Sequence, residues 1–167
     1  RKVPRSAIEN GELLEEGVRL FPNGGSFFQK VNRVNKKGPT YRTISPNGPL
    51  RLIIRASADK SNEGLQPHME VKIGFQKEVT TSMKTLETVF LSSDKPRDYI
   101  FDIRAENFPL VLRESVAMKR VEIHNASDSG TSTMTNEELP KIVLESIRIE
   151  FPYYKQWPPE THNRIIG

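Results

Sequence analysis

The sequence of 167 residues contains no cysteine. This excludes disulfides, thiolate metal sites, a cysteine nucleophile and covalently attached haem within the segment, because each needs a cysteine sulfur. No uncharged apolar run reaches the ~18 residues that a membrane-spanning helix requires. Residues 1–10 lack the apolar stretch of a signal peptide. A chain that begins at Arg1 is therefore expected to be processed or excised from a larger protein.

Charge of one sign is not concentrated anywhere in the chain. There are 25 Lys and Arg against 21 Asp and Glu, which gives a net charge of +4 and a pI of about 9.4. A nucleic-acid-binding domain usually gathers its basic residues on one face. Here they are scattered among acidic residues, and the densest basic stretch, residues 32–38, is typical of a solvated turn. We therefore predict that nucleic acid is not a partner.

Amphipathic helix patterns are also missing, and alternating strand patterns take their place. In the clearest strand, residues 50–58, Leu50, Leu52 and Ile54 alternate with Arg51, Ile53 and Arg55, which predicts one buried face. Strands are predicted at residues 18–21, 26–31, 50–58, 69–75, 85–91, 99–105, 116–124 and 141–151. Residues 1–17 are expected to wrap an edge, with a short helical turn as the alternative for residues 8–14. Short strands separated by turn signals predict an all-β, jelly-roll β-sandwich that forms a single domain over residues 1–167.

The last predicted strand, residues 141–151, is long and apolar, so we place it centrally and beside the N-terminal strands. Val143, Ile147 and Ile149 are two or four positions apart, which predicts that they share one face with Phe151. Glu145 is the one carboxylate in the middle of this strand. It is interpreted as a satisfied structural acceptor, with an outward-pointing side chain as the alternative.

Two polar loops offer oxygen atoms that could bind a sugar or calcium. The candidate ligand-binding side chains are those of Asp59, Asn62, Glu63, Asn125 and Asp128. Calcium prefers such carboxylate and amide oxygens, although solvated polar turns are the commoner case. His68, His124 and His162 have no spacing typical of a metal site, and surface histidines are the favoured interpretation.

The C-terminal tail, residues 153–167, is predicted to lead to the next domain. Tyr153, Tyr154 and Trp157 lie within five positions of one another. They could form a stacking platform for sugar rings, but the favoured interpretation is that they cover one end of the sandwich or pack on the next domain. The two polar loops contain no aromatic residue of their own, so one of these tyrosines would have to provide the face on which a sugar stacks.

Several segments resemble one domain of large planctomycete proteins, in which a c-type cytochrome-like module precedes several domains of unknown function. The similar segments are residues 49–58, 102–110, 141–150 and 154–165, and the last contains a W-P-P-x-x-H-x-R motif. The resemblance implies a carbohydrate-binding-module-like, galactose-binding-like jelly roll between helical domains. It also implies an exported, periplasmic or cell-surface location, with haem c only in a neighbouring domain of the full-length protein.

These observations leave three functional hypotheses. The first is a non-catalytic carbohydrate-binding-like module that contacts polysaccharide and the flanking domains of the same polypeptide. The second is a purely structural domain that orients neighbouring haem and helical domains. The third is a hydrolase that uses Glu145, which we favour least because no second acid converges on it in the sequence.

Overall fold

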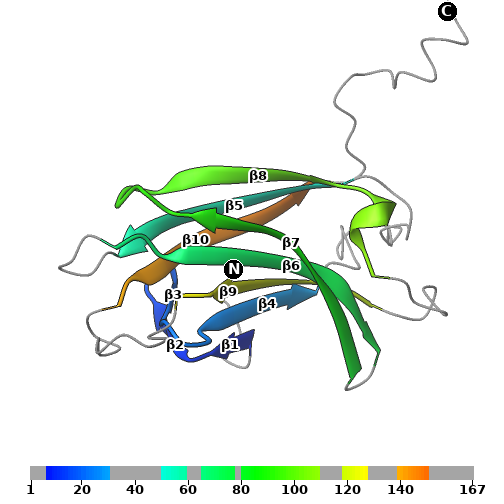
Figure 1. The fold of residues 1–167 in the computed structure, drawn as a ribbon, viewed down its shortest axis with the longest axis horizontal. Coiled ribbons are helices and arrows are strands. Elements are labelled where there is room, and N and C mark those ends of the chain that lie inside the picture. Colours follow the sequence, from blue (N-terminus) through cyan, green and yellow to red (C-terminus); the bar gives the residue numbers. More distant parts are fainter. Residues whose placement is uncertain are drawn as a thin grey trace, which may run out of the picture.

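The computed structural model describes residues 7–30, 50–59, 65–77, 80–109, 118–127 and 139–150. These residues form two antiparallel five-stranded sheets that face each other (Figure 1). Sheet A has the spatial order β1 (Ile8–Glu9), β4 (Ser26–Lys30), β9 (Met118–Asn125), β6 (His68–Lys77) and β7 (Thr80–Phe90). Sheet B has the order β2 (Gly11–Leu14), β3 (Gly17–Leu20), β10 (Lys141–Glu150), β5 (Leu50–Asp59) and β8 (Arg97–Ile103).

The connections make the sandwich a jelly roll. Among the described strands, β2–β3 and β6–β7 are consecutive partners within one sheet, while the other consecutive strands lie in opposite sheets. This crossing pattern brings β10 between β3 and β5, in the centre of sheet B. The predicted fold class and the predicted central position of the last strand are confirmed.

The core lies between the two sheets and follows the alternation of the sequence. All the apolar residues predicted for the buried faces of β5 and β6 are buried, and Ile54 is fully inaccessible to solvent. They are Leu50, Leu52, Ile54, Ala56 and Ala58 on β5, and Met69, Val71, Ile73 and Phe75 on β6. Burial of apolar side chains in two facing layers is the main favourable free energy of such a fold.

The prediction that Val143 shares a face with Ile147 and Ile149 is wrong. A β-bulge at Glu145 shifts the register between Leu144 and Ser146 relative to β5. The extra residue reverses the alternation, so Ile147 and Ile149 pack against the core while Val143 is on the outer face. Gly17 lies across from the bulge with a φ of 107°, and a Cβ there would lie 2.2 Å from the carbonyl oxygen of Leu144.

Residues 8–14 form the strands β1 and β2, so the alternative of a helical turn there is wrong. β1 and β2 are edge strands of sheets A and B, which confirms that this segment wraps an edge. β7 begins five residues earlier than predicted. The predicted strand over residues 99–105 ends at Ile103, because Ala105 begins a 3-10 helix, η2 (Ala105–Asn107). Phe151 lies outside the described residues.

Five connections meet at one end of the sandwich, which we call the Asp59 end. It is defined by the C-terminal ends of β1, β3, β5, β7 and β9 and the N-terminal ends of β2, β4, β6, β8 and β10 (Figure 1). Hydrogen bonds between the connecting loops and the strands hold it together, including one from the backbone N–H of Ala58 on β5 to the carbonyl oxygen of Ser93 in the β7–β8 loop at 2.8 Å. Within the described ranges, no helix has the length and hydrophobicity that crossing a bilayer requires.

Candidate functional site

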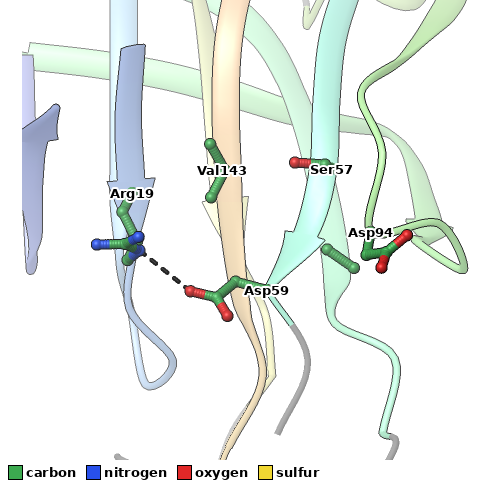
Figure 2. Close-up of a pocket in the computed structure, with 6 residues that line it drawn as sticks. Arg19, Ser57, Asp59, Asp94 and Val143 are labelled. Atoms are coloured by element: carbon green, nitrogen blue, oxygen red, sulfur yellow. Dashed lines mark ion pairs between the residues drawn. The ribbon is translucent and has the colours of Figure 1, made fainter. Parts of the chain in front are cut away.

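An open groove of about 600 Å³ lies on the outer face of sheet B at the Asp59 end. Three neighbouring strands and one loop form it, as Figure 2 shows: β3 provides Arg19, β10 provides Val143, and β5 provides Ser57 and Asp59. The loop from β7 to β8 adds Asp94 on the far side. Alternate residues of a strand point to the same face, so Ser57 and Asp59 are brought together by their spacing.

Arg19 is the cation of the groove and is held between two carboxylates. It pairs with Glu12 across the β2–β3 hairpin, and its Nε lies 3.1 Å from Oδ2 of Asp59. The Nε atom is buried, yet it makes no hydrogen bond within the described part of the chain. A buried N–H donor normally finds a partner in protein, water or ligand. Arg19 is thus fixed beside a carboxylate acceptor, and its side chain as a whole is 31% exposed at the groove.

Asp94 is positioned by the backbone of the loop that carries it. The hydrogen bond between Ala58 and Ser93 ties this loop to the end of β5, and the hydroxyl of Ser93 accepts a hydrogen bond of 3.1 Å from the backbone N–H of Lys95. Asp94 itself is exposed. The groove thus combines a guanidinium, a hydroxyl and two carboxylates, which together can donate and accept hydrogen bonds.

Asn125 also lies at the Asp59 end, but its side chain is only 1% exposed. Its amide nitrogen donates to the carbonyl oxygens of Leu20 and Pro140, at 3.1 Å each. Its Oδ1 accepts a hydrogen bond from the backbone N–H of Ser127. The side chain therefore joins the end of β3 to the start of β10. Its predicted contact with a ligand stays a prediction.

The structure brings Asp59 and Asn125, the first residues of the two predicted sets of ligand-binding candidates, to the same end of the sandwich. Six other candidates lie outside the described residues: Asn62, Glu63, Asp128, Tyr153, Tyr154 and Trp157. The three aromatic candidates follow Glu150, and Glu150 pairs with Arg51 at the end of β10 that is opposite to Asp59.

Sequence reasoning missed Arg19, Ser57 and Asp94. The outward positions of Ser57 and Asp59 could have been found, because the alternation of residues 50–58 was recognised. Arg19 carried no such signal, because its partner Asp59 is 40 positions away along the chain. Only the placement of β10 between β3 and β5 brings these two residues to one surface.

A second polar network covers the outer face of sheet A. Glu122 on β9 is at its centre, with a side chain only 13% exposed. Nε2 of His124 donates to its Oε1 at 2.8 Å, and Nε of Arg120 donates to its Oε2 at 2.7 Å. The guanidinium of Arg120 also lies 3.7 Å from the ring centroid of Phe28. The hydrogen bond from His124, followed by the charge of Arg120, holds the pKa of Glu122 below its ordinary value of 4.5, although burial opposes this shift.

Histidines and carboxylates do not gather into a metal cluster within the described residues. No group of three or more such side chains is close enough to hold an ion there. His68 and His124 lie on adjacent strands of sheet A, and His162 lies outside the described residues. Glu145 lies on the outer face of sheet B, with its Oε2 3.7 Å from Nε of Arg55. This oxygen accepts no hydrogen bond from the residues described, which differs from the satisfied acceptor that we expected.

Comparisons with known proteins show the fold. The CBM36-1 domain of a multidomain xylanase from the hindgut metagenome of Trinervitermes trinervoides aligns with a TM-score of 0.50 and 12% identity, over 85% of this chain and 86% of that domain. The CBM22-2 xylan-binding domain of Xyn10C from Paenibacillus barcinonensis has a TM-score of 0.48 and 10% identity, over 80% and 76%. No protein-family model matches the sequence, and no curated protein matches it as a relative. The chain has a carbohydrate-binding-module-like jelly-roll fold.

Proposed function

We propose that this chain is a non-catalytic module that binds a neutral polysaccharide at the Asp59 end. The observation that carries the proposal is the open groove in which Arg19 is held between Glu12 and Asp59, next to Ser57 and Asp94. An open groove admits the middle of a long polymer, whereas an enclosed cavity admits only a small molecule or a chain end. The likeness to a carbohydrate-binding module supports the fold in which such a groove occurs.

The charges of the groove favour a ligand that is neutral and rich in hydroxyl groups. Sugar hydroxyls can accept hydrogen bonds from the guanidinium of Arg19 and donate them to the carboxylates of Asp59 and Asp94. A polyanion would be repelled by those carboxylates, and a polycation would be repelled by the guanidinium of Arg19. Hydrogen bonds to charged groups are stronger than those between neutral groups, so these few residues can orient a sugar chain.

The larger context is also part of the proposal. We propose that the module belongs to an exported, periplasmic or cell-surface protein that carries haem c in another domain; the resemblance of its segments to planctomycete proteins supports this. The alternative function is structural, with the domain orienting its haem-bearing and helical neighbours. The two proposals differ in whether the isolated module binds a glycan.

Isothermal titration calorimetry against soluble xylan, mannan and mixed-linkage glucan tests the proposal. We expect weak binding to at least one of them, with a Kd of about 0.1–1 mM. Asp59→Asn should weaken binding because the Arg19 guanidinium loses its anchor and the ligand loses an acceptor. Asp102→Asn is the matched control, because Asp102 pairs with Arg51 on the same outer face at a greater distance from the groove. If no glycan gave binding heat, the proposal of polysaccharide binding would be wrong and the structural function would remain.

The same titration, run with calcium and with a chelator, tests whether calcium orders the polar loops. Calcium takes six to eight oxygen ligands. The described part of the groove provides the carboxylates of Asp59 and Asp94. The predicted calcium ligands Asn62, Glu63 and Asp128 lie outside the described residues. Binding that is lost with the chelator and restored by calcium would support a calcium site.

A further inference from the structure

An exposed aromatic pair lies at the Asp59 end, on the opposite sheet from the groove. His68 at the start of β6 pairs in register with Phe90 at the end of β7. Their ring centroids are 4.4 Å apart, with an angle of 32° between the ring planes. Phe90 is 61% exposed, and it is the most exposed large apolar side chain of the described residues. One face of the Phe90 ring is therefore supported by the imidazole, while the rest of the ring is open to solvent.

The backbone under this pair is held in place. Leu91 follows Phe90, is fully buried, and donates a hydrogen bond of 3.0 Å to the carbonyl oxygen of Pro67. The backbone N–H of His68 donates to the hydroxyl of Ser127, and the carbonyl oxygen of His68 accepts a hydrogen bond from Ala126. The aromatic pair is thus preorganised, and a ligand that uses it does not have to order a mobile segment.

Polar groups with unused hydrogen-bonding capacity adjoin the rings. Glu70 is two residues from His68 on the same face of β6, and Thr88 is opposite Glu70 on β7. One carboxylate oxygen of Glu70 accepts a hydrogen bond from Thr85 at 3.0 Å, and the other lies 3.7 Å from Nζ of Lys72. The ring nitrogens of His68 have no hydrogen-bond partner among the described residues. An apolar ring is therefore bordered by a carboxylate, a hydroxyl and an imidazole.

We propose that Phe90, His68 and Glu70 form a sugar-stacking subsite on the outer face of sheet A. A pyranose ring has an apolar face of C–H groups and a rim of hydroxyls, so it matches an aromatic ring that is bordered by polar groups. The C–H face packs on Phe90, while the hydroxyls bind to His68 and Glu70. This inference rests on the proposed function, and it provides the aromatic face that the groove of sheet B lacks.

A second copy of the chain fits this surface less well than a sugar does. A stable protein–protein interface buries more than about 1,000 Å² around an apolar centre, and the apolar part of this surface is one phenylalanine beside an imidazole. The neighbouring residues Glu70 and Lys72 would have to be desolvated in such an interface. A sugar instead replaces their water with hydroxyls.

The test uses calorimetry with the polysaccharide of the panel that the unmodified chain binds. Phe90→Ala should lower the affinity by roughly tenfold, as expected when a central aromatic contact is removed. Phe90→Leu keeps an apolar side chain but removes the flat ring, so it should lower the affinity nearly as much as Phe90→Ala. Phe90→Trp keeps a flat ring, so it should retain the affinity. Ile100→Ala is the matched control, since Ile100 is 54% exposed on the outer face of sheet B. It should bind as the unmodified chain does.

The outcomes separate this subsite from the groove. Unchanged affinity in Phe90→Ala, with a loss in Asp59→Asn, would overturn the subsite and leave the proposed function standing. Equal affinity for Phe90→Leu and the unmodified chain would overturn stacking. Sedimentation that shows a dimer for the unmodified chain and a monomer for Phe90→Ala, with unchanged glycan affinity, would assign the pair to self-association. Absence of binding by the unmodified chain would overturn both proposals. Circular dichroism confirms that each variant is folded.

Discussion

At the scale of single residues, Asn125 shows how a polar side chain can stabilise the end of a β-sandwich. Two backbone carbonyls depend on its amide, and they belong to segments that are 105 and 15 positions away from it. A buried acceptor that loses its donor costs about 1–3 kcal/mol. We therefore predict that Asn125→Ala lowers the free energy of unfolding by at least about 2 kcal/mol, measured by urea denaturation.

Asn107→Ala is the control for Asn125. Oδ1 of Asn107 accepts a hydrogen bond from the backbone N–H of Arg104, but the contact is exposed. Water can replace an exposed partner, so this variant should cost less than about 1 kcal/mol. Equal losses in the two variants would show that the buried hydrogen bonds of Asn125 contribute no more than an exposed one.

The pH dependence of stability should report on Glu122. The native pKa of this carboxyl is lowered by the hydrogen bond from His124 and the charge of Arg120, so the native state binds its proton less readily than the unfolded state does. Stability from this group is therefore present above its ordinary pKa of 4.5 and is lost as the pH falls through the lower native value. Glu122→Gln, followed by urea denaturation between about pH 6 and pH 3, should show a shallower loss toward acid. An unchanged slope would contradict this origin.

Sequence reasoning found the buried residues of this fold better than its functional candidates. Ile54 and Val71 were recognisable because alternation requires only their neighbours in the chain. The burial of Asn125 was not recognisable, because its partners Leu20 and Pro140 are brought to it only by the crossings of the chain between the two sheets. For the same reason Phe90 was seen as part of a strand, and its exposed ring beside His68 was not foreseen.

At the scale of elements, the bulge at Glu145 decides which residues of β10 are buried. Before it, Ile142 and Leu144 pack inward, and after it Ile147 and Ile149 do so. Period-two counting assumes an unbroken strand, so it assigned Val143 to the wrong face. The residue types themselves gave no sign of the bulge, because Val143 is as apolar as its neighbours.

This bulge leads to a prediction about the deletion of one residue. Deleting Glu145 would remove the extra position, and one half of β10 would then turn its apolar side chains to solvent. We expect a loss of about 3–6 kcal/mol, because two buried aliphatic side chains contribute about 1.5–3 kcal/mol each. Glu145→Ala keeps the register and removes only a 3.7 Å surface ion pair, so it should cost no more than about 1 kcal/mol. Thermal unfolding compares the two, and similar melting temperatures would contradict the role of the bulge.

At the scale of the whole molecule, the jelly roll separates stability from recognition. The two sheets bury a shared core, while the connections at the Asp59 end carry polar groups whose identity the core does not dictate. Strands from both sheets end there, so one end presents the groove on sheet B and the aromatic pair on sheet A. A polysaccharide is long enough to contact both surfaces, and two weak contacts on one polymer raise the overall affinity.

The overall charge of the molecule provides a test of which polymer it binds. The net charge is +4, so a polyanion would be attracted over a distance that salt screens. For a neutral polysaccharide, binding relies on short hydrogen bonds and ring contacts, and salt screens these little because the ligand carries no charge. We therefore predict that raising the salt concentration from about 0.05 to 0.5 M changes the Kd by less than about twofold.

A polyanion held by several cations would instead lose affinity by at least about a hundredfold, because salt opposes the release of counterions, as it does for nucleic acids. Calorimetry at the two salt concentrations, with xylan as the neutral polymer and heparin as the polyanion, distinguishes these cases, and a steep salt dependence with xylan would contradict recognition through the paired groups of the groove.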